Sequence, residues 1–93
     1  MNKKSHNTAR LRDADGNKNL ISQRLLELRT KHKLSQRDLA AKLQTCGYDL
    51  DRNVITRIET NKRSVSDIEL KAISSFFKVS YQYLIDGNDE KQT

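Results

Sequence analysis

LSQRDLAAKL, residues 34–43, and VITRIE, residues 54–59, are the two segments from which the architecture follows. Ser35 stands before the first segment as an N-cap, and Asp38 comes three residues later, where a capping box has its acid. Polar and basic side chains alternate with the apolar ones at helical intervals. The apolar positions of the two segments are Leu39, Ala40, Leu43, Ile55 and Ile58. The sequence therefore predicts two short amphipathic helices joined by a turn, at residues 36–45 and 52–60.

Helical periodicity continues on both sides of this pair. Residues 19–31 are predicted to form a helix with Asn19 as N-cap, and Ser66 with Glu69 forms a capping box that opens a helix at 67–77. A last helix is expected at 81–86, with Ser80 as its N-cap. From these helices, the side chains expected to face the interior of the domain are Leu20, Ile21, Leu25, Leu28, Leu70, Ile73, Ser74, Phe77 and Leu84. Because the chain has no proline and no alternating apolar pattern, the predicted fold class is all-α with five helices.

Several residues carry signals for the ends of helices. Gly47 and Asn61 suit the left-handed conformation that follows a helix, and Gly87 ends the last helix in the same way. Asp51 is the predicted N-cap of helix 52–60. Leu50, directly before this cap, is expected to pack against the core.

Length and charge give the domain organisation and the class of partner. A chain of 93 residues forms one small domain, placed at residues 19–87. Residues 1–18 have few apolar anchors and five basic against two acidic side chains, so a flexible basic arm is expected there. Residues 88–93 are expected to fray. The net charge of +6 favours a polyanion as partner.

Other classes of function find little support in the sequence. Cys46 is the only cysteine, and neither His6 nor His32 belongs to a ligand cluster, so no metal, cofactor or disulfide is expected. The chain has no phosphate-cradling glycine loop and no histidine placed to activate a nucleophile, which argues against an enzyme. No apolar run is long enough to span a membrane, and a cytoplasmic location is expected.

Read together, the motifs resemble the phage-repressor and Cro-like helix-turn-helix proteins, the XRE family. The marks are Leu28-Arg29, Leu34-Ser35-Gln36, Ile55-Thr56-Arg57-Ile58-Glu59, Asn61-Lys62-Arg63 and Ile73…Phe77…Val79-Ser80…Leu84, over roughly residues 20–86. The resemblance implies a five-helix, lambda-repressor-like domain that binds operator DNA as a homodimer and represses transcription. One departure is the spacing between Leu43 and Ile55, about five residues more than usual, which should lengthen helix 36–45 by a turn and enlarge the following loop.

The resemblance also assigns roles to residues. Helix 52–60 is implied to be the recognition helix, with base contacts from Arg52, Asn53, Thr56 and Arg57. Phosphate contacts fall to Gln36, Arg37, Lys62 and Arg63, and a structural ion pair is expected between Arg29 and Glu59. The chemistry of these residues agrees with the implied roles. Arg can donate two hydrogen bonds to guanine, and Asn can form two with adenine. The N-terminus of helix 36–45 favours an anion such as a phosphate. The alternative is that these side chains form an ordinary solvated helix face.

Some assignments stay open at this level. Phe76, Tyr81 and Ile85 form either a dimer interface or local packing. Arg12 and the basic residues before it form either a minor-groove arm or a solubilising tail, with the tail favoured. A DNA-binding antitoxin with a protein partner, and a protein-interaction module that keeps the fold, are the alternative functions. The operator, and the choice between repression and activation, are not encoded in these patterns.

Overall fold

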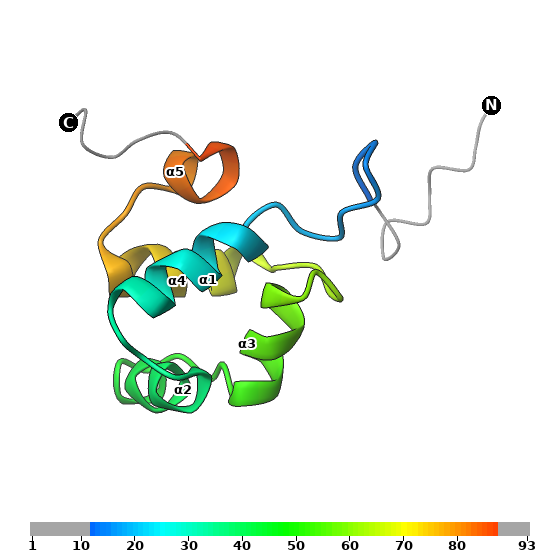
Figure 1. Ribbon diagram of the computed structural model, residues 1–93. Coiled ribbons are helices and arrows are strands. Elements are labelled where there is room, and N and C mark those ends of the chain that lie inside the picture. Colours follow the sequence, from blue (N-terminus) through cyan, green and yellow to red (C-terminus); the bar gives the residue numbers. More distant parts are fainter. Residues whose placement is uncertain (1–11, 88–93) are drawn as a thin grey trace.

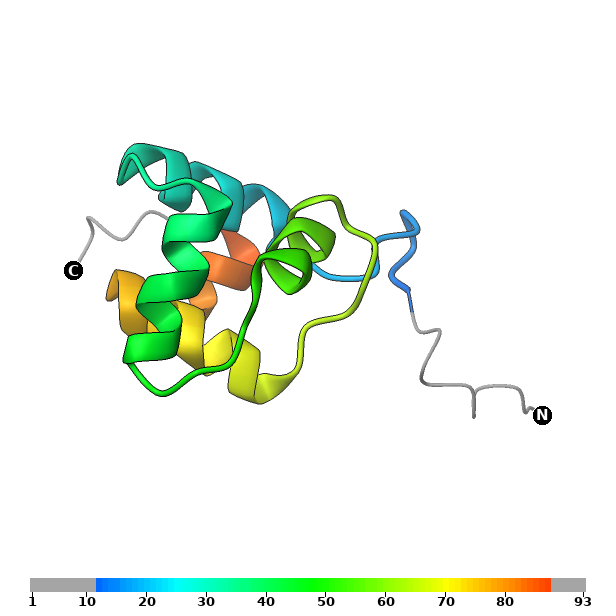
Figure 2. The ribbon, with the colours of Figure 1, turned by 90° about the horizontal axis from the view of Figure 1, so that it is seen from below.

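The computed structural model describes residues 12–87 and contains five helices within them. Over this range there is no strand, so the predicted all-α, five-helix fold is confirmed. The helices are α1 (Ser22–Lys31), α2 (Gln36–Thr45), α3 (Arg52–Glu59), α4 (Asp67–Phe77) and α5 (Tyr81–Asp86). Helices α2 and α3 lie on one side of the molecule and α5 on the other, with α1 and α4 between them (Figures 1 and 2).

Four of the five helices begin at the side-chain caps that the sequence predicts. The Ser35 and Ser66 hydroxyls accept hydrogen bonds from the third residue of α2 and α4, and both capping boxes are complete. The Asp51 carboxylate accepts from Val54 N, and the Ser80 hydroxyl accepts from Tyr83 N. Each cap satisfies an amide that would otherwise have no partner in the first turn, so short helices can begin at defined residues.

The first helix differs from the prediction. It begins at Ser22, and Ile21 occupies the cap position without a side-chain cap. Asn19 is instead buried, and its Nδ2 donates to the carbonyl oxygens of Ile58 and Arg63, at 3.1 and 3.0 Å. The assignment of Asn19 as N-cap was wrong because α1 begins at Ser22 and the Asn19 Oδ1 accepts from Ile21 N, an amide that precedes the helix. Its Nδ2 joins the start of the domain to the segment after α3.

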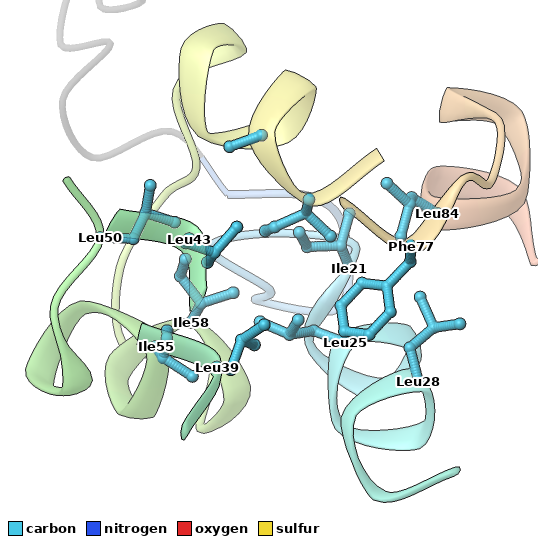
Figure 3. Packing of buried hydrophobic residues seen from close by; sticks show 12 residues of the cluster. Ile21, Leu25, Leu28, Leu39, Leu43, Leu50, Ile55, Ile58, Phe77 and Leu84 are labelled. Atoms are coloured by element: carbon cyan, nitrogen blue, oxygen red, sulfur yellow. The ribbon is translucent and has the colours of Figure 1, made fainter. Parts of the chain in front are cut away.

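Twelve buried apolar side chains form one core. They come from the residue before α1, all five helices and the α2–α3 loop: Ile21, Leu25, Leu28, Leu39, Leu43, Leu50, Ile55, Ile58, Ala72, Ile73, Phe77 and Leu84. Figure 3 shows these side chains turned toward a common interior. Leu50 is buried as predicted, whereas Leu20, expected inside, is 52 % exposed. Leu70 and Ser74 are only partly buried, and Ala72 takes the inner position between them.

Hydrogen bonds also join residues before Asn19 to the domain. Asp13 accepts hydrogen bonds from the backbone amides of Asp15 and Asn17, and Lys18 N donates to Asn61 Oδ1. Residues 12–18 therefore form a turn that is bonded to the domain, and we call it the N-terminal turn. The rest of the predicted arm, residues 1–11, and the predicted frayed end, 88–93, lie outside the described residues.

Candidate nucleic-acid interface

Helix α3 presents three exposed polar side chains that the fold does not use. Arg52, Asn53 and Arg57 are exposed, and within residues 12–87 their side chains make no hydrogen bond or ion pair. The opposite side of α3 is buried through Ile55 and Ile58, which are both 0 % exposed. The burial of one face fixes which side of α3 faces outward, and that side carries donors suited to base edges.

Thr56, the fourth predicted base contact, is engaged inside the protein. Its side chain is partly buried, and its Oγ1 lies 2.7 Å from Gln36 Oε1 and 3.0 Å from the Arg52 carbonyl oxygen. A hydroxyl has one proton to donate, and here it is shared between these two acceptors. Thr56 thus differs from its exposed neighbours, because its donor is already in use.

Gln36, a predicted phosphate contact, links α2 to α3. Its Oε1 accepts from Thr56, and its Nε2 donates to Glu59 Oε1 at 2.9 Å. One Nε2 proton is left, since an amide nitrogen carries two. Arg37 is the next residue on α2 and is exposed. Of these two residues, Arg37 has the more accessible charge, while Gln36 fixes the position of α3 relative to the start of α2.

The Arg29–Glu59 ion pair is present and completes this network. Arg29 Nε donates to Glu59 Oε2 at 2.6 Å, and the second nitrogen, Nη2, donates to Oε1 at 2.9 Å. The two side chains are only 12 % and 4 % exposed. Hydrogen bonding to Glu59 raises the pKa of Arg29, and its Nη1 also donates to the Leu34 carbonyl. The pair joins α1 to α3 and, through Leu34, to the start of α2.

Sequence reasoning identified the ion pair but missed the links through Gln36 and Thr56. Together, Arg29, Glu59, Gln36 and Thr56 form a continuous set of hydrogen bonds that spans α1, α2 and α3. The only sequence signal was that polar residues stand beside apolar core positions on three helices. Such a network holds α3 in one orientation, because every member has its partner.

Within residues 12–87, the loop after α3 has one cation without an ion pair and one paired cation. Lys62 is exposed, and its backbone amide donates to the Arg57 carbonyl at 2.8 Å, which keeps the two residues close. Arg63 is less exposed, and its Nη1 lies 3.0 Å from Glu69 Oε1 on α4. The predicted phosphate contacts are therefore not equivalent, since Lys62 has its whole charge available and Arg63 shares part of its guanidinium with Glu69.

The three residues considered for a dimer interface have different surroundings. Phe76 is partly buried and packs edge-on against Phe77, with ring centroids 4.9 Å apart. Tyr81 and Ile85 on α5 are 49 % and 39 % exposed. Ile85 also lines an apolar pocket of about 300 Å³ together with Leu20, Val65 and Leu70 among others. Phe76 is thus part of the local packing, and α5 retains the exposed apolar surface.

Other kinds of site receive no support from the described residues. Between residues 12 and 87, no group of His, Cys, Asp and Glu side chains is arranged to hold a metal ion. Cys46 is exposed at the end of α2. None of the helices in this range is both long and apolar enough to cross a membrane.

Comparison with known proteins agrees with this geometry. A family model described as Helix-turn-helix (HTH_3) matches residues 25–84, which include most of α1, all of α2 to α4 and the start of α5. Neither the curated proteins nor the solved structures gave a match. The match covers more than half of the chain, including the hydrogen-bond network and the exposed face of α3, so the chain belongs to the XRE-type helix-turn-helix family of DNA-binding transcription regulators.

Proposed function

We propose that this protein recognises a specific, near-palindromic operator as a homodimer and represses transcription from it. The proposal is supported by the difference between the exposed and the hydrogen-bonded polar side chains of α3. Arg52, Asn53 and Arg57 are exposed, and their side chains have no partner among residues 12–87. Thr56 and Glu59 on the same helix are bound into the network with Gln36. A helix fixed by its neighbours, with free donors on its outer face, is suited to read a major groove.

The contacts divide into two kinds. Arg52, Asn53 and Arg57 are proposed to bond to base edges, where the Arg fork suits guanine and the Asn amide suits adenine. Arg37 and Lys62 are proposed to bind phosphates and so set the position of α3 on the duplex. Gln36 and Arg63 contribute to the phosphate contacts only through the N–H groups that the protein leaves unused.

A homodimer would place two copies of α3 in successive turns of the major groove. Recognition helices of this type lie about 34 Å apart, so the operator would carry two half-sites about one turn apart. Tyr81 and Ile85 on α5, with the adjoining pocket, are the proposed dimer surface. As a regulator of this family, the protein is proposed to have no catalytic activity and to work in the cytoplasm.

Selection from a random duplex library tests this function. The purified full chain is incubated with the library at about 150 mM salt, and the retained DNA is sequenced. Enrichment of an inverted repeat with half-sites about one turn apart is the expected result. Retention without enrichment would mean that only the general attraction of the basic surface is at work. No retention would exclude operator binding by this chain.

The exposed apolar surface of α5 also fits a second function, that of a DNA-binding antitoxin. In that case Tyr81 and Ile85 would contact a different protein instead of a second copy of this chain. Light scattering on the purified chain distinguishes the two functions. A dimer in the absence of any partner supports the first, and a monomer that binds DNA only with a co-purifying protein supports the second.

A further inference from the structure

Asn61, at the end of α3, holds the N-terminal turn against the segment between α3 and α4. Its Oδ1 accepts hydrogen bonds from the backbone amides of Lys18 at 2.8 Å and Asn19 at 3.1 Å, and its Nδ2 donates to Asn17 Oδ1. Asn61 itself is in the left-handed conformation, with φ of 60°. Both polar atoms of one side chain are therefore used to attach a segment more than forty residues away in the sequence.

The N-terminal turn also has hydrogen bonds within itself. The Asp13 carboxylate accepts from Asn17 N at 2.8 Å, from Asn17 Nδ2 at 3.0 Å and from Asp15 N at 3.0 Å. These bonds, chiefly those from Asn17, lower the pKa of Asp13. Asn17 thus joins the turn to Asn61, because its Nδ2 bonds to Asp13 while its Oδ1 bonds to Asn61.

The attachment places this turn beside the proposed phosphate contacts. Lys18 is bonded to Asn61, Lys62 is the next residue, and the Lys62 amide is bonded to the Arg57 carbonyl. Asn19 also donates to the Arg63 carbonyl, so the chain is held on both sides of Lys62. In Figures 1 and 2 the segment before α1 lies next to the loop that follows α3.

The charge of this region suits a polyanion. Arg12 and Lys18 are exposed, and their side chains make no ion pair within the described residues. Two carboxylates, Asp13 and Asp15, oppose them, and the bonds that Asp13 accepts lower its pKa, so it stays ionised at neutral pH. The sequence before Arg12 adds Lys3, Lys4 and Arg10 and no acidic residue, so residues 1–18 together carry a net charge of +3.

We propose that the N-terminal turn, held by Asn61, is a second contact region for the DNA backbone, in which Arg12 and Lys18 bind phosphates beside Lys62. The proposal rests on the proposed DNA-binding function and extends its footprint beyond α2, α3 and the loop after α3. Asn61 acts as a positioning residue, because its side chain holds the turn and does not itself contact the phosphate. A bonded turn loses less freedom on binding than a loose tail does, so its charges contribute more to the affinity.

The test measures binding of the full chain to a mixed-sequence duplex as a function of salt, since phosphate contacts do not depend on sequence. The variant Arg12→Ala/Lys18→Ala is expected to reduce the slope of log K against log salt by about two and to lower the affinity about 30-fold at about 150 mM salt. Lys31→Ala, at the other end of α1, is the matched control and is expected to leave the slope unchanged.

Asn61→Gly tests the positioning role. Glycine keeps the positive φ without strain and removes only the side-chain hydrogen bonds. Asn61→Gly is expected to remove much of the DNA affinity that Arg12 and Lys18 supply. Adding Arg12→Ala/Lys18→Ala to this variant should then lower the affinity only slightly further. Asn17→Ala removes the bond between Asn17 and Asn61 together with the side-chain bond from Asn17 to Asp13, and it is the second variant if Asn61→Gly melts at a lower temperature than the parent chain.

Three results would overturn the proposal. In the first, Arg12→Ala/Lys18→Ala has the same salt slope as the Lys31→Ala control. In the second, Arg12→Ala/Lys18→Ala lowers the DNA affinity as much in the Asn61→Gly and Asn17→Ala backgrounds as it does in the parent chain. In the third, the parent chain itself would not bind the duplex, which rejects the proposed function as well. A slope reduced by Lys62→Ala but not by Arg12→Ala/Lys18→Ala would reject the second contact region and leave DNA binding intact.

Discussion

Glu59 is the residue at which α1, α2 and α3 meet. Its side chain is 4 % exposed, and its two oxygens accept from Arg29 Nε, Arg29 Nη2 and Gln36 Nε2. A carboxylate this far from water is costly unless it is fully hydrogen-bonded. The donors from α1 and α2 meet that requirement, and the position of α3 then depends on them.

Replacement of Glu59 tests how much its ion pair with Arg29 contributes to the stability of the fold. Glu59→Gln leaves the Arg29 guanidinium buried without a counter-charge, and the free energy of unfolding is expected to fall by about 3–5 kcal/mol. Urea denaturation measures the change. The control is Glu27→Gln, whose side chain is 50 % exposed and lies 3.8 Å from Arg24; it should change stability by under about 1 kcal/mol. Equal effects would show that the Glu59 pair is no more important than a surface pair.

Asp38 makes the stability of the domain depend on pH in the acidic range. The Ser35 backbone amide and hydroxyl, through the capping box, hold the pKa of Asp38 below its usual value of 3.8. A depressed pKa contributes stability above the unfolded-state value, and this contribution is lost as pH falls through the folded-state value. NMR titration of the Asp38 carboxyl carbon should therefore give a midpoint below 3.8, and a midpoint at or above 3.8 in the folded protein would contradict the capping-box assignment.

At the scale of the element, α3 and the loop after it should respond differently to truncation. Arg57→Ala is expected to cost about 1–3 kcal/mol at the preferred operator and to relax the preference for one base pair. Lys62→Ala is expected to weaken binding to all DNA sequences alike and to reduce the slope of log K against log salt by about one. Binding to the selected operator and to single-base variants of it, at several salt concentrations, measures both. If the two variants behave identically, α3 is not the reading element.

Across the whole molecule, the exposed apolar surface of α5 predicts the oligomeric state. Ile85→Lys places a charge in the pocket formed with Leu20 and Leu70, so a dimer that uses this surface should dissociate. Light scattering over a range of protein concentrations shows the change in mass. Ile68→Lys is the matched control, because Ile68 is 66 % exposed and does not line this pocket. A dimer that survives Ile85→Lys would place the interface elsewhere.

The sequence by itself determined the helices and the faces on which they pack. The caps at Ser35, Asp51 and Ser66 act over three residues, and the apolar stripes repeat within one helix, so neither depends on distant parts of the chain. The same reasoning placed Asn61 in the left-handed conformation. These features are local, and a local pattern is sufficient to predict them.

Only the tertiary structure decided how the polar side chains are used. Gln36 and Thr56 bond to each other across twenty residues, and Asn19 and Asn61 join segments about forty residues apart. Each of these side chains also suits a cap, a phosphate or a solvated surface, so its sequence neighbours do not select among the possibilities. Which partner it takes depends on which helices the core brings together, and that is settled by packing over the whole domain.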